Sequence, residues 1–200
     1  MKTRARVKDL KNKMSESELR NYFSSHSHIT KNHWDAICWH QELSEDFIRE
    51  FQDKVNWFDI SLKHNLSEAF IREFKDKVKW SRISGSNNLS EDFIREFQDK
   101  VDWKAISYHQ KLSEAFIREF QDKVNWEEIC RYQKLSEDFI REFQDKVDWK
   151  VISEHQELSE AFIREFKDKV VWSRISGNHL SESFIREFQD KLLCRLLVWA

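Results

Sequence analysis

Apolar residues recur along this chain at the spacing of one helical face. In a representative stretch, Phe47, Phe51 and Val55 follow one another every four residues, with polar residues between them. This interval places the three side chains on one side of an α-helix. Ser44 stands just before the stripe, where a serine hydroxyl can cap the first backbone amides. The pattern therefore predicts a helix from about Glu45 to Lys54.

A second helix is predicted directly afterwards. Asn56 can cap it, and Trp57 and Ile60 would form its apolar face. Equivalent capping residues stand before later tryptophans, namely Asp102, Asn125 and Asp148. In two copies, Gly85 and Gly177 fall where a helix would end, so we expect them in the left-handed conformation that terminates many helices.

This pair of predicted helices is repeated with a 23-residue period. The phrase LSE-x-FIREF opens at Leu43, Leu66, Leu89, Leu112, Leu135, Leu158 and Leu180, the last after a step of 22. The tryptophans that keep the 23-residue step are Trp34, Trp57, Trp80, Trp103, Trp126, Trp149 and Trp172. Helices this short are not stable alone, so neighbouring repeats must cover their apolar faces. We predict an all-α fold, an α/α solenoid of about eight two-helix repeats.

The repeat boundaries divide the chain into four parts. Residues 1–13 form a basic N-terminal segment, and residues 14–42, which begin MSESELRNYF, form a degenerate first repeat that caps the array. Six regular repeats occupy 43–179, and residues 180–200 form a C-terminal capping repeat. The basic segment carries a net charge of +5 and is read as a solvated tail, with a localisation signal or a phosphate-binding arm as the alternatives.

Composition supports this architecture and narrows the class of protein. The chain has no proline and only two glycines, which favours helix over β-turns. Basic and acidic residues are nearly balanced at a net charge of −2, so no nucleic-acid partner is expected. No apolar run approaches the ~18 residues of a membrane span, and the N-terminus lacks the apolar core of a secretory signal. We expect a soluble cytoplasmic protein with no membrane partner.

Two phrases, LSEDFIREFQDKVNW and LSEAFIREFKDKV, resemble short repeats of uncharacterised proteins encoded by large DNA viruses of amoebae. The resemblance covers roughly Leu43 to the C-terminus. It implies an α/α repeat fold and a viral origin, with a location inside the host cell, and it implies no activity. The architecture is also similar to tetratricopeptide-type helical pairs, although the 23-residue period is shorter than the 34 residues of that family.

Catalytic chemistry is not expected, because catalysis needs a unique set of groups and this sequence supplies copies. Carboxylates such as Glu45 and Asp53 recur in most repeats, and two glycines cannot build a phosphate-binding loop. We predict that the protein is not an enzyme and needs no cofactor.

Cysteines and histidines are interpreted as structural or surface residues. Cys38 and Cys130 occupy a position that serine fills in other repeats, which indicates a small, tight site. The insertion of the first repeat contains His26, His28 and His33, but their spacing matches no strong zinc pattern. No metal site is therefore predicted.

Residues that differ between repeats indicate where a partner binds. The first helix hardly changes, whereas the positions after each tryptophan vary, and on a stacked array they would form one continuous stripe. Tyrosine and arginine commonly anchor protein interfaces. We therefore predict a partner-binding patch made of Lys104, Tyr108, His109, Glu127, Arg131 and Tyr132. Neutral drift after recent duplication would produce the same variation and remains the alternative.

The C-terminal segment is unusually apolar for the end of a solenoid, with Leu193, Leu196, Leu197 and Trp199. Either it folds back as the last helix, or it is a docking surface, which would predict a homo-oligomer. From these features we predict a non-catalytic scaffold that binds another protein through the variable face of the second helices. The alternative is a spacer or cement protein of a virus particle.

Overall fold

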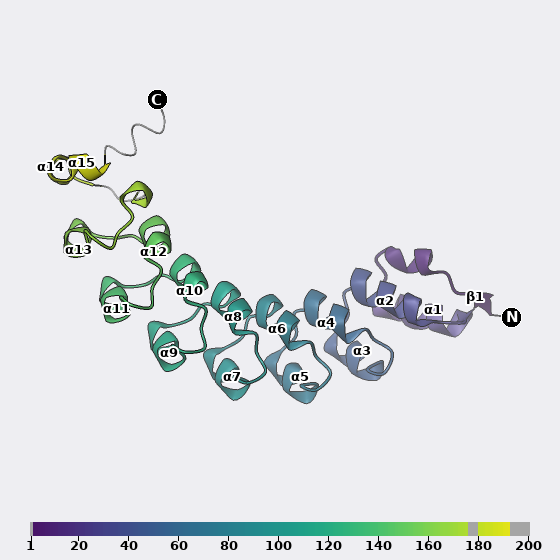
Figure 1. The fold of residues 1–200 in the computed structure, drawn as a ribbon. Coiled ribbons are helices and arrows are strands. Elements are labelled where there is room, and N and C mark those ends of the chain that lie inside the picture. Colours follow the sequence, from purple (N-terminus) through teal and green to yellow (C-terminus); the bar gives the residue numbers. More distant parts are fainter. Residues whose placement is uncertain (1, 176–179, 193–200) are drawn as a thin grey trace, which may run out of the picture. The chain divides into compact units, whose positions relative to one another are not determined.

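The computed structural model describes residues 2–175 and 180–192, and helices dominate both ranges (Figure 1). The chain divides into two compact units, Met1–Asp102 and Trp103–Ala200. Each unit consists of two-helix repeats stacked on one another, so the predicted α/α solenoid is confirmed.

Unit 1 contains β1 (Thr3–Arg4), the 3-10 helix η1 (Val7–Lys11), α1 (Glu16–Ser25), β2 (His26–Ser27), α2 (Lys31–His40), α3 (Glu45–Glu50), α4 (Trp57–Lys63), α5 (Glu68–Glu73), α6 (Trp80–Ser86) and α7 (Glu91–Glu96). Unit 2 contains α8 (Trp103–His109), α9 (Glu114–Glu119), α10 (Trp126–Tyr132), α11 (Glu137–Glu142), α12 (Trp149–His155), α13 (Glu160–Glu165), the 3-10 helix η2 (Trp172–Arg174), α14 (Glu182–Glu187) and α15 (Gln189–Leu192). We call α1, α3, α5, α7, α9, α11, α13 and α14 the first helices. The helices that begin near a repeat tryptophan are the second helices: α2, α4, α6, α8, α10 and α12.

Each first helix of the regular repeats begins at the predicted cap but is shorter than predicted. The Ser44 hydroxyl accepts a hydrogen bond from the amide of Phe47 at 3.1 Å, as expected. The helix then ends at Glu50, not near Lys54, because Phe51 leaves the helical region with φ −109° and ψ 25°. The turn that follows frees the carbonyl of Gln52 to accept the indole N–H of Trp57 at 3.0 Å.

The second helices also begin at the predicted caps. The side chains of Asn56, Asn125 and Asp148 each accept a backbone N–H in the first turn of the following helix. The prediction for Gly85 is wrong, because this residue lies inside α6 and no described glycine has a positive φ. The helix ends with extended backbone at Asn87, whose side chain accepts the amide of Leu66 at 2.7 Å. Gly177 lies outside the described residues.

The core consists of apolar side chains of each repeat that pack against those of the next repeat. Phe70 and Ile71 are fully buried, as are their counterparts in every other described regular repeat up to Phe162 and Ile163. Trp57 lies against Phe74 of the next repeat, with ring centroids 5.0 Å apart. Burial of each such side chain contributes roughly 1.5–3 kcal/mol. The tryptophans therefore act in packing, as the sequence indicates.

One small side chain in each second helix joins neighbouring repeats. The hydroxyl of Ser61 donates to the carbonyl of Trp57 at 2.6 Å and accepts the backbone amide of Lys79, one repeat later, at 2.9 Å. At the same position, the sulfur of Cys38 accepts the amide of Asn56 at 3.3 Å. The exchange of serine and cysteine is explained, because both are small and both accept this amide.

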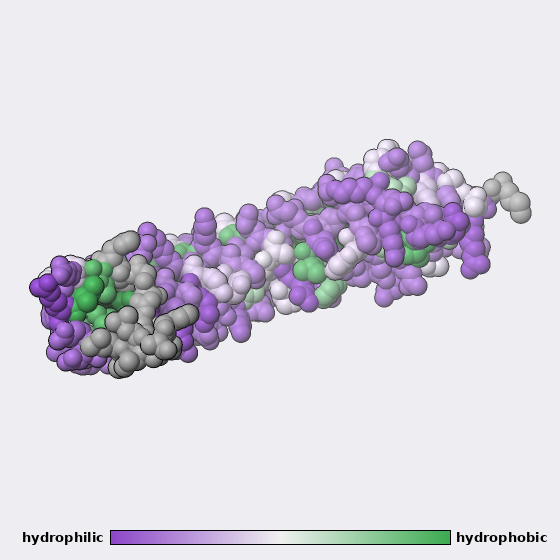
Figure 2. All heavy atoms as spheres, turned by 90° about the horizontal axis from the view of Figure 1, so that it is seen from above, coloured by the Kyte–Doolittle hydropathy of each residue, from purple (hydrophilic) through white to green (hydrophobic). Residues whose placement is uncertain are grey.

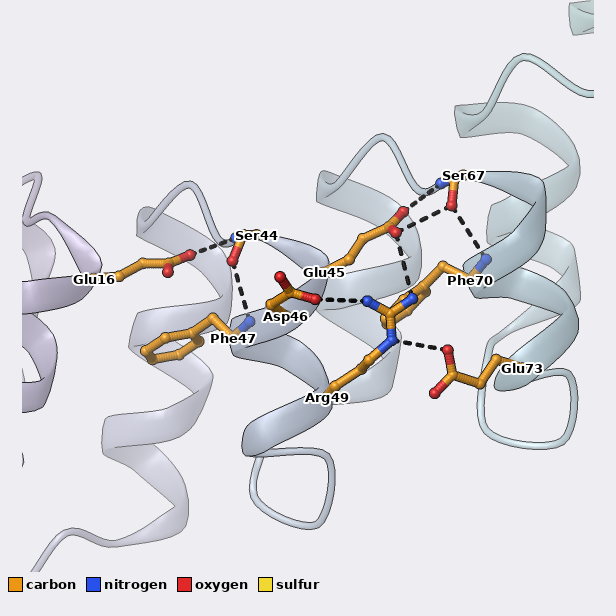
Figure 3. A network of polar contacts seen from close by, with 9 residues as sticks. All are labelled: Glu16, Ser44, Glu45, Asp46, Phe47, Arg49, Ser67, Phe70 and Glu73. Atoms are coloured by element: carbon orange, nitrogen blue, oxygen red, sulfur yellow. Dashed lines mark hydrogen bonds and ion pairs between the residues drawn. The ribbon is translucent and has the colours of Figure 1, made fainter.

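Glutamate and arginine side chains connect neighbouring first helices. Figure 3 shows Glu45, whose carboxylate accepts the backbone amide of Ser67 at 2.6 Å. Arg49 pairs with Asp46 on its own helix and reaches Glu73 of the next repeat at 2.8 Å. These residues are polar and exposed, yet they are used for joining repeats, which explains why they hardly change along the chain.

The prediction of a solvated tail for residues 1–13 is wrong. The 3-10 helix η1 packs against α2, and Leu10 is fully buried. Gln41 donates to the carbonyls of Leu10 at 2.6 Å and Asn12 at 2.8 Å. Gln133 makes the same kind of contact to the carbonyls of the preceding second helix. The N-terminal segment therefore takes the place of a second helix and covers the first repeat.

Candidate protein-binding surface

Most of the residues that vary between repeats lie on the exposed side of the second helices, although Asp59, His64 and Val151 are buried. We call this side the variable face. Five large hydrophobic side chains are exposed among the described residues, and four of them are on second helices: Trp39, Phe58, Tyr108 and Tyr132. In the view of Figure 2, hydrophilic residues cover most of the surface and hydrophobic ones appear at a few separate places. Aromatic groups available to a partner are thus concentrated on the face with the most variable sequence.

Two predicted site residues of unit 2 form the centre of a patch. Tyr108, near the end of α8, and Tyr132, at the end of α10, have ring centroids 4.2 Å apart. They are 43% and 47% exposed, so solvent reaches both rings although they touch. His109 lies 4.3 Å from Tyr108, measured between ring centroids. These three residues are brought together because α8 and α10 pack side by side.

The remaining predicted residues surround these rings with charge. Arg131 pairs with Glu127 on its own helix at 3.0 Å. The ammonium of Lys104 lies 3.9 Å from the carboxylate of Glu128 in the next repeat. A hydrogen bond with Tyr108 raises the pKa of the Tyr132 phenol. We call Lys104, Tyr108, His109, Glu127, Arg131 and Tyr132 the tyrosine patch.

A cavity of about 320 Å³ adjoins the tyrosine patch on the side toward α12. It is lined by Arg131, Tyr132, Gln133, Lys134, Leu135, His155, Gln156 and Glu157. The sequence reasoning missed Lys134 and Glu157 as surface neighbours of the patch. The sequence does indicate them, because this repeat position changes from lysine to glutamate between adjacent repeats. A partner side chain placed here would contact both an aromatic ring and charged groups.

Unit 1 presents a second aromatic group on its variable face, which sequence reasoning also missed. The ammonium of Lys63 lies 4.0 Å from the centroid of the Trp39 ring, and the guanidinium of Arg82 lies 4.6 Å from that of Phe58. A cation that lies over an aromatic ring in this way is attracted by the face of the ring. Trp39 carried a usable signal, because it is a tryptophan outside the 23-residue series.

Cysteine and histidine side chains considered as candidate reactive or metal-binding groups are engaged within the structure. Cys38 and Cys130 are free thiols buried in the core, and burial raises their pKa to about 12 and about 11. His26 stacks on Tyr22, and His33 bonds to Thr30. Within residues 2–175 and 180–192, no group of three or more histidine, cysteine, aspartate or glutamate side chains is arranged to hold a metal ion.

Comparisons with known proteins leave the surface without an assigned role. No family model matches the chain, and no curated protein or solved structure does so either. Among the described helices, none has the length and apolar character needed to span a membrane. The apolar C-terminal residues Leu193, Leu196, Leu197 and Trp199 lie outside the described residues, as does Cys194.

Proposed function

We propose that this protein is a non-catalytic scaffold that binds a partner protein through the variable face of its second helices. The observation that carries the proposal is the location of the exposed aromatic residues: Trp39, Phe58, Tyr108 and Tyr132 all lie on that face. Leaving large aromatic side chains in water gives up the free energy of their burial. Exposed aromatic residues next to arginine are typical of the centres of protein interfaces.

A difference between the contacts of the first and second helices supports this proposal. The unvarying residues of the first helix are occupied by contacts within the array: Ser44 caps, Phe47 is buried, and Arg49 pairs with the next repeat. The varying residues of the second helix make fewer contacts of this kind within the array. In solenoids, an exposed surface built from successive repeats is the usual place for a partner.

The tyrosine patch is the preferred centre of this interface in unit 2. Two tyrosine rings in contact form a rigid apolar platform, and their hydroxyls and Arg131 supply hydrogen-bond donors at its edge. The adjoining cavity offers a place for a partner side chain. Burial of an aromatic side chain at the centre of an interface commonly contributes about 2 kcal/mol or more to the free energy of binding.

The experiment is a binding comparison between matched variants. Partners are captured from host-cell lysate on the immobilised full chain, purified, and titrated by calorimetry against three proteins. These are the wild type, Tyr108→Ala/Tyr132→Ala, and a control, Asp122→Ala/Asp145→Ala. The control carboxylates are highly exposed and pair with lysines at the surface, where such pairs contribute little to stability.

We expect the tyrosine variant to bind at least about tenfold more weakly and the control to bind like the wild type. Equal affinities for all three would place the interface elsewhere and contradict the proposal. If purified virus particles contain the chain at a fixed stoichiometry while no partner shows measurable affinity, the alternative function as a spacer or cement protein is favoured.

A further inference from the structure

Five tryptophans of the regular repeats make the same hydrogen bond. The indole N–H donates to the backbone carbonyl five residues earlier. This bond is formed by Trp57 to Gln52 at 3.0 Å, Trp80 to Lys75 at 2.9 Å, Trp126 to Gln121 at 2.9 Å, Trp149 to Gln144 at 2.9 Å and Trp172 to Lys167 at 3.0 Å. The bond depends on the short turn after each first helix, which presents that carbonyl.

The same turn ends in a lysine whose ammonium has a constant partner. It binds the aspartate of the preceding repeat and lies close to the tryptophan ring. The pairs are Lys77 with Asp53 at 3.3 Å, Lys100 with Asp76 at 3.0 Å, Lys146 with Asp122 at 2.8 Å, Lys169 with Asp145 at 3.6 Å and Lys191 with Asp168 at 3.5 Å. A carboxylate therefore accompanies the lysine and tryptophan in these repeats.

Trp34 of the first repeat and Lys54, the corresponding lysine of the next repeat, lack these partners within the described part of the chain. Among the described residues, none accepts the indole N–H of Trp34, and none forms an ion pair with Lys54. The cause is the sequence between α1 and α2. α1 ends with Ser24 and Ser25, and no Gln-Asp pair occurs there. The residue five before Trp34 is Ile29, in the inserted loop after β2.

Trp34 and Lys54 line one cavity of about 450 Å³, which is within the size range of small-molecule sites. Its other lining residues are Phe23, Ile29, Thr30, Lys31, Phe51 and Asp53. The rings of Phe23, Trp34 and Phe51 form its aromatic wall, with centroids between 5.0 and 5.5 Å apart. The cavity thus combines an apolar wall with two polar groups, the indole N–H of Trp34 and the ammonium of Lys54. Within the described residues, both lack the hydrogen-bond and ion-pair partners that the equivalent groups have in the regular repeats.

The charges around this cavity favour an anion. Lys31 and Lys54 have no ion pair among the described residues, whereas Asp53 is engaged by Lys77 at 3.3 Å. A cavity lined by aromatic rings can also attract a cation through the ring faces. Here, however, two ammonium groups without an ion pair in the described part of the chain stand at the cavity and its carboxylate is paired with Lys77, so a cationic ligand would meet like charge.

We propose that this cavity binds a small monocarboxylate with a flat apolar body. Its carboxylate takes the role that aspartate and backbone carbonyl share in the regular repeats. It accepts the charge-assisted hydrogen bond of the Lys54 ammonium and the N–H of Trp34. The apolar body lies against Phe23 and Ile29, which have no counterparts in the later repeats. This binding site is independent of the variable face.

The test uses hydrocinnamate as the probe and the full chain as the protein. Indole N–H signals are followed in a proton–nitrogen correlation spectrum, and the signal of Trp34 is identified by its loss in Trp34→Phe. Phenylpropanol and phenylpropylamine serve as the neutral and cationic analogues of the probe. Lys54→Gln is compared with Lys169→Gln, the same change at the equivalent position of a regular repeat. Circular dichroism confirms that both variants are folded.

We expect hydrocinnamate to shift the Trp34 signal in a saturable manner and the two analogues to bind at least about tenfold more weakly. Lys54→Gln should weaken binding by a similar factor, and Lys169→Gln should leave it unchanged. Equal binding of the alcohol, tighter binding of the amine, or equal loss in both lysine variants would each overturn the assignment. So would the absence of any saturable shift of the Trp34 signal.

Discussion

At the scale of single residues, the small position in each second helix shows how a minor side chain governs the stacking. Ser61 and Cys38 both accept the amide that precedes the next second helix. An unpaired amide in that place would lose a hydrogen bond in a buried setting, at a cost of about 1–3 kcal/mol. The sequence shows that the position is small, but its acceptor role depends on a residue 18 positions away.

This environment predicts the reactivity of the two described cysteines. Burial raises the pKa of Cys38 to about 12 and that of Cys130 to about 11, whereas an unfolded thiol ionises near ~8.5. Only the thiolate reacts with alkylating agents. In a Cys194→Ser background at pH ~8, iodoacetamide should therefore modify both thiols at least about a hundredfold more slowly in the folded chain than in guanidinium. Peptide mapping by mass spectrometry measures the rates.

The same shift sets the direction of the pH dependence. Because the folded thiols hold their protons more tightly than the unfolded ones, their contribution to stability is complete below pH ~8.5. It declines as the pH rises through about 11 for Cys130 and about 12 for Cys38. Replacing Cys38 and Cys130 by serine should remove that part of the alkaline loss. Modification of both thiols in the folded chain at the unfolded rate would show that they are not protected.

At the scale of elements, the N-terminal segment shows how a helix position can be filled without a recognisable repeat. The 3-10 helix η1 covers α2 with Leu10, and Gln41 binds its carbonyls as later glutamines bind the carbonyls of second helices. The basic residues of this segment led to the prediction of a tail because they dominate its composition. Its single buried leucine is visible only when α2 is beside it.

Leu10→Ala tests whether this segment is part of the core. Loss of a fully buried leucine costs about 2–5 kcal/mol, whereas a leucine in a solvated tail would contribute less than ~0.5 kcal/mol. We expect urea unfolding followed by circular dichroism to show the larger loss. Lys11→Ala, an exposed neighbour on the same 3-10 helix, is the control and should change the free energy of unfolding little.

At the scale of the whole molecule, stability is distributed over repeats that contact their neighbours. Ser, Arg and Glu side chains repeat the same contacts at each step, as in the pairs Arg49–Glu73 and Arg141–Glu165. In such an array the free energy is roughly a sum over repeats and the contacts between them. The length of the chain should therefore be adjustable in whole repeats.

Excision of residues 135–157, which hold α11 and α12, should leave a folded protein because Lys134 then precedes the equivalent leucine, Leu158. We expect unchanged helicity per residue and a urea m-value smaller by about a tenth, in proportion to the surface removed. The control deletes 135–147, which removes α11 but leaves α12 without its first helix, and this loss of register should lower the free energy of unfolding. Equal stability of the two deletions would argue against register-dependent stacking.

The candidate sites divide in the same way between sequence and structure. Variation between repeats pointed to Tyr108 and Tyr132. They are 24 residues apart and so do not occupy equivalent repeat positions, and only the structure shows that their rings meet. The pairing of Lys104 with Glu128 could not be chosen over Glu127, because neighbouring residues of a helix point in different directions. The first-repeat cavity was not predicted at all, since it depends on a loop with no counterpart in the other repeats.

By itself the sequence determined the class of fold, the period, the caps and the identity of the core residues. These features depend on local hydrogen bonds and on periodic burial, which act over a few residues and are repeated along the chain. Only the tertiary structure decided where the first helices stop, how Gly85 is accommodated, what covers α2, and which side chains meet at each surface. Those outcomes depend on contacts between residues about 18 to 31 positions apart, whose geometry no local pattern contains.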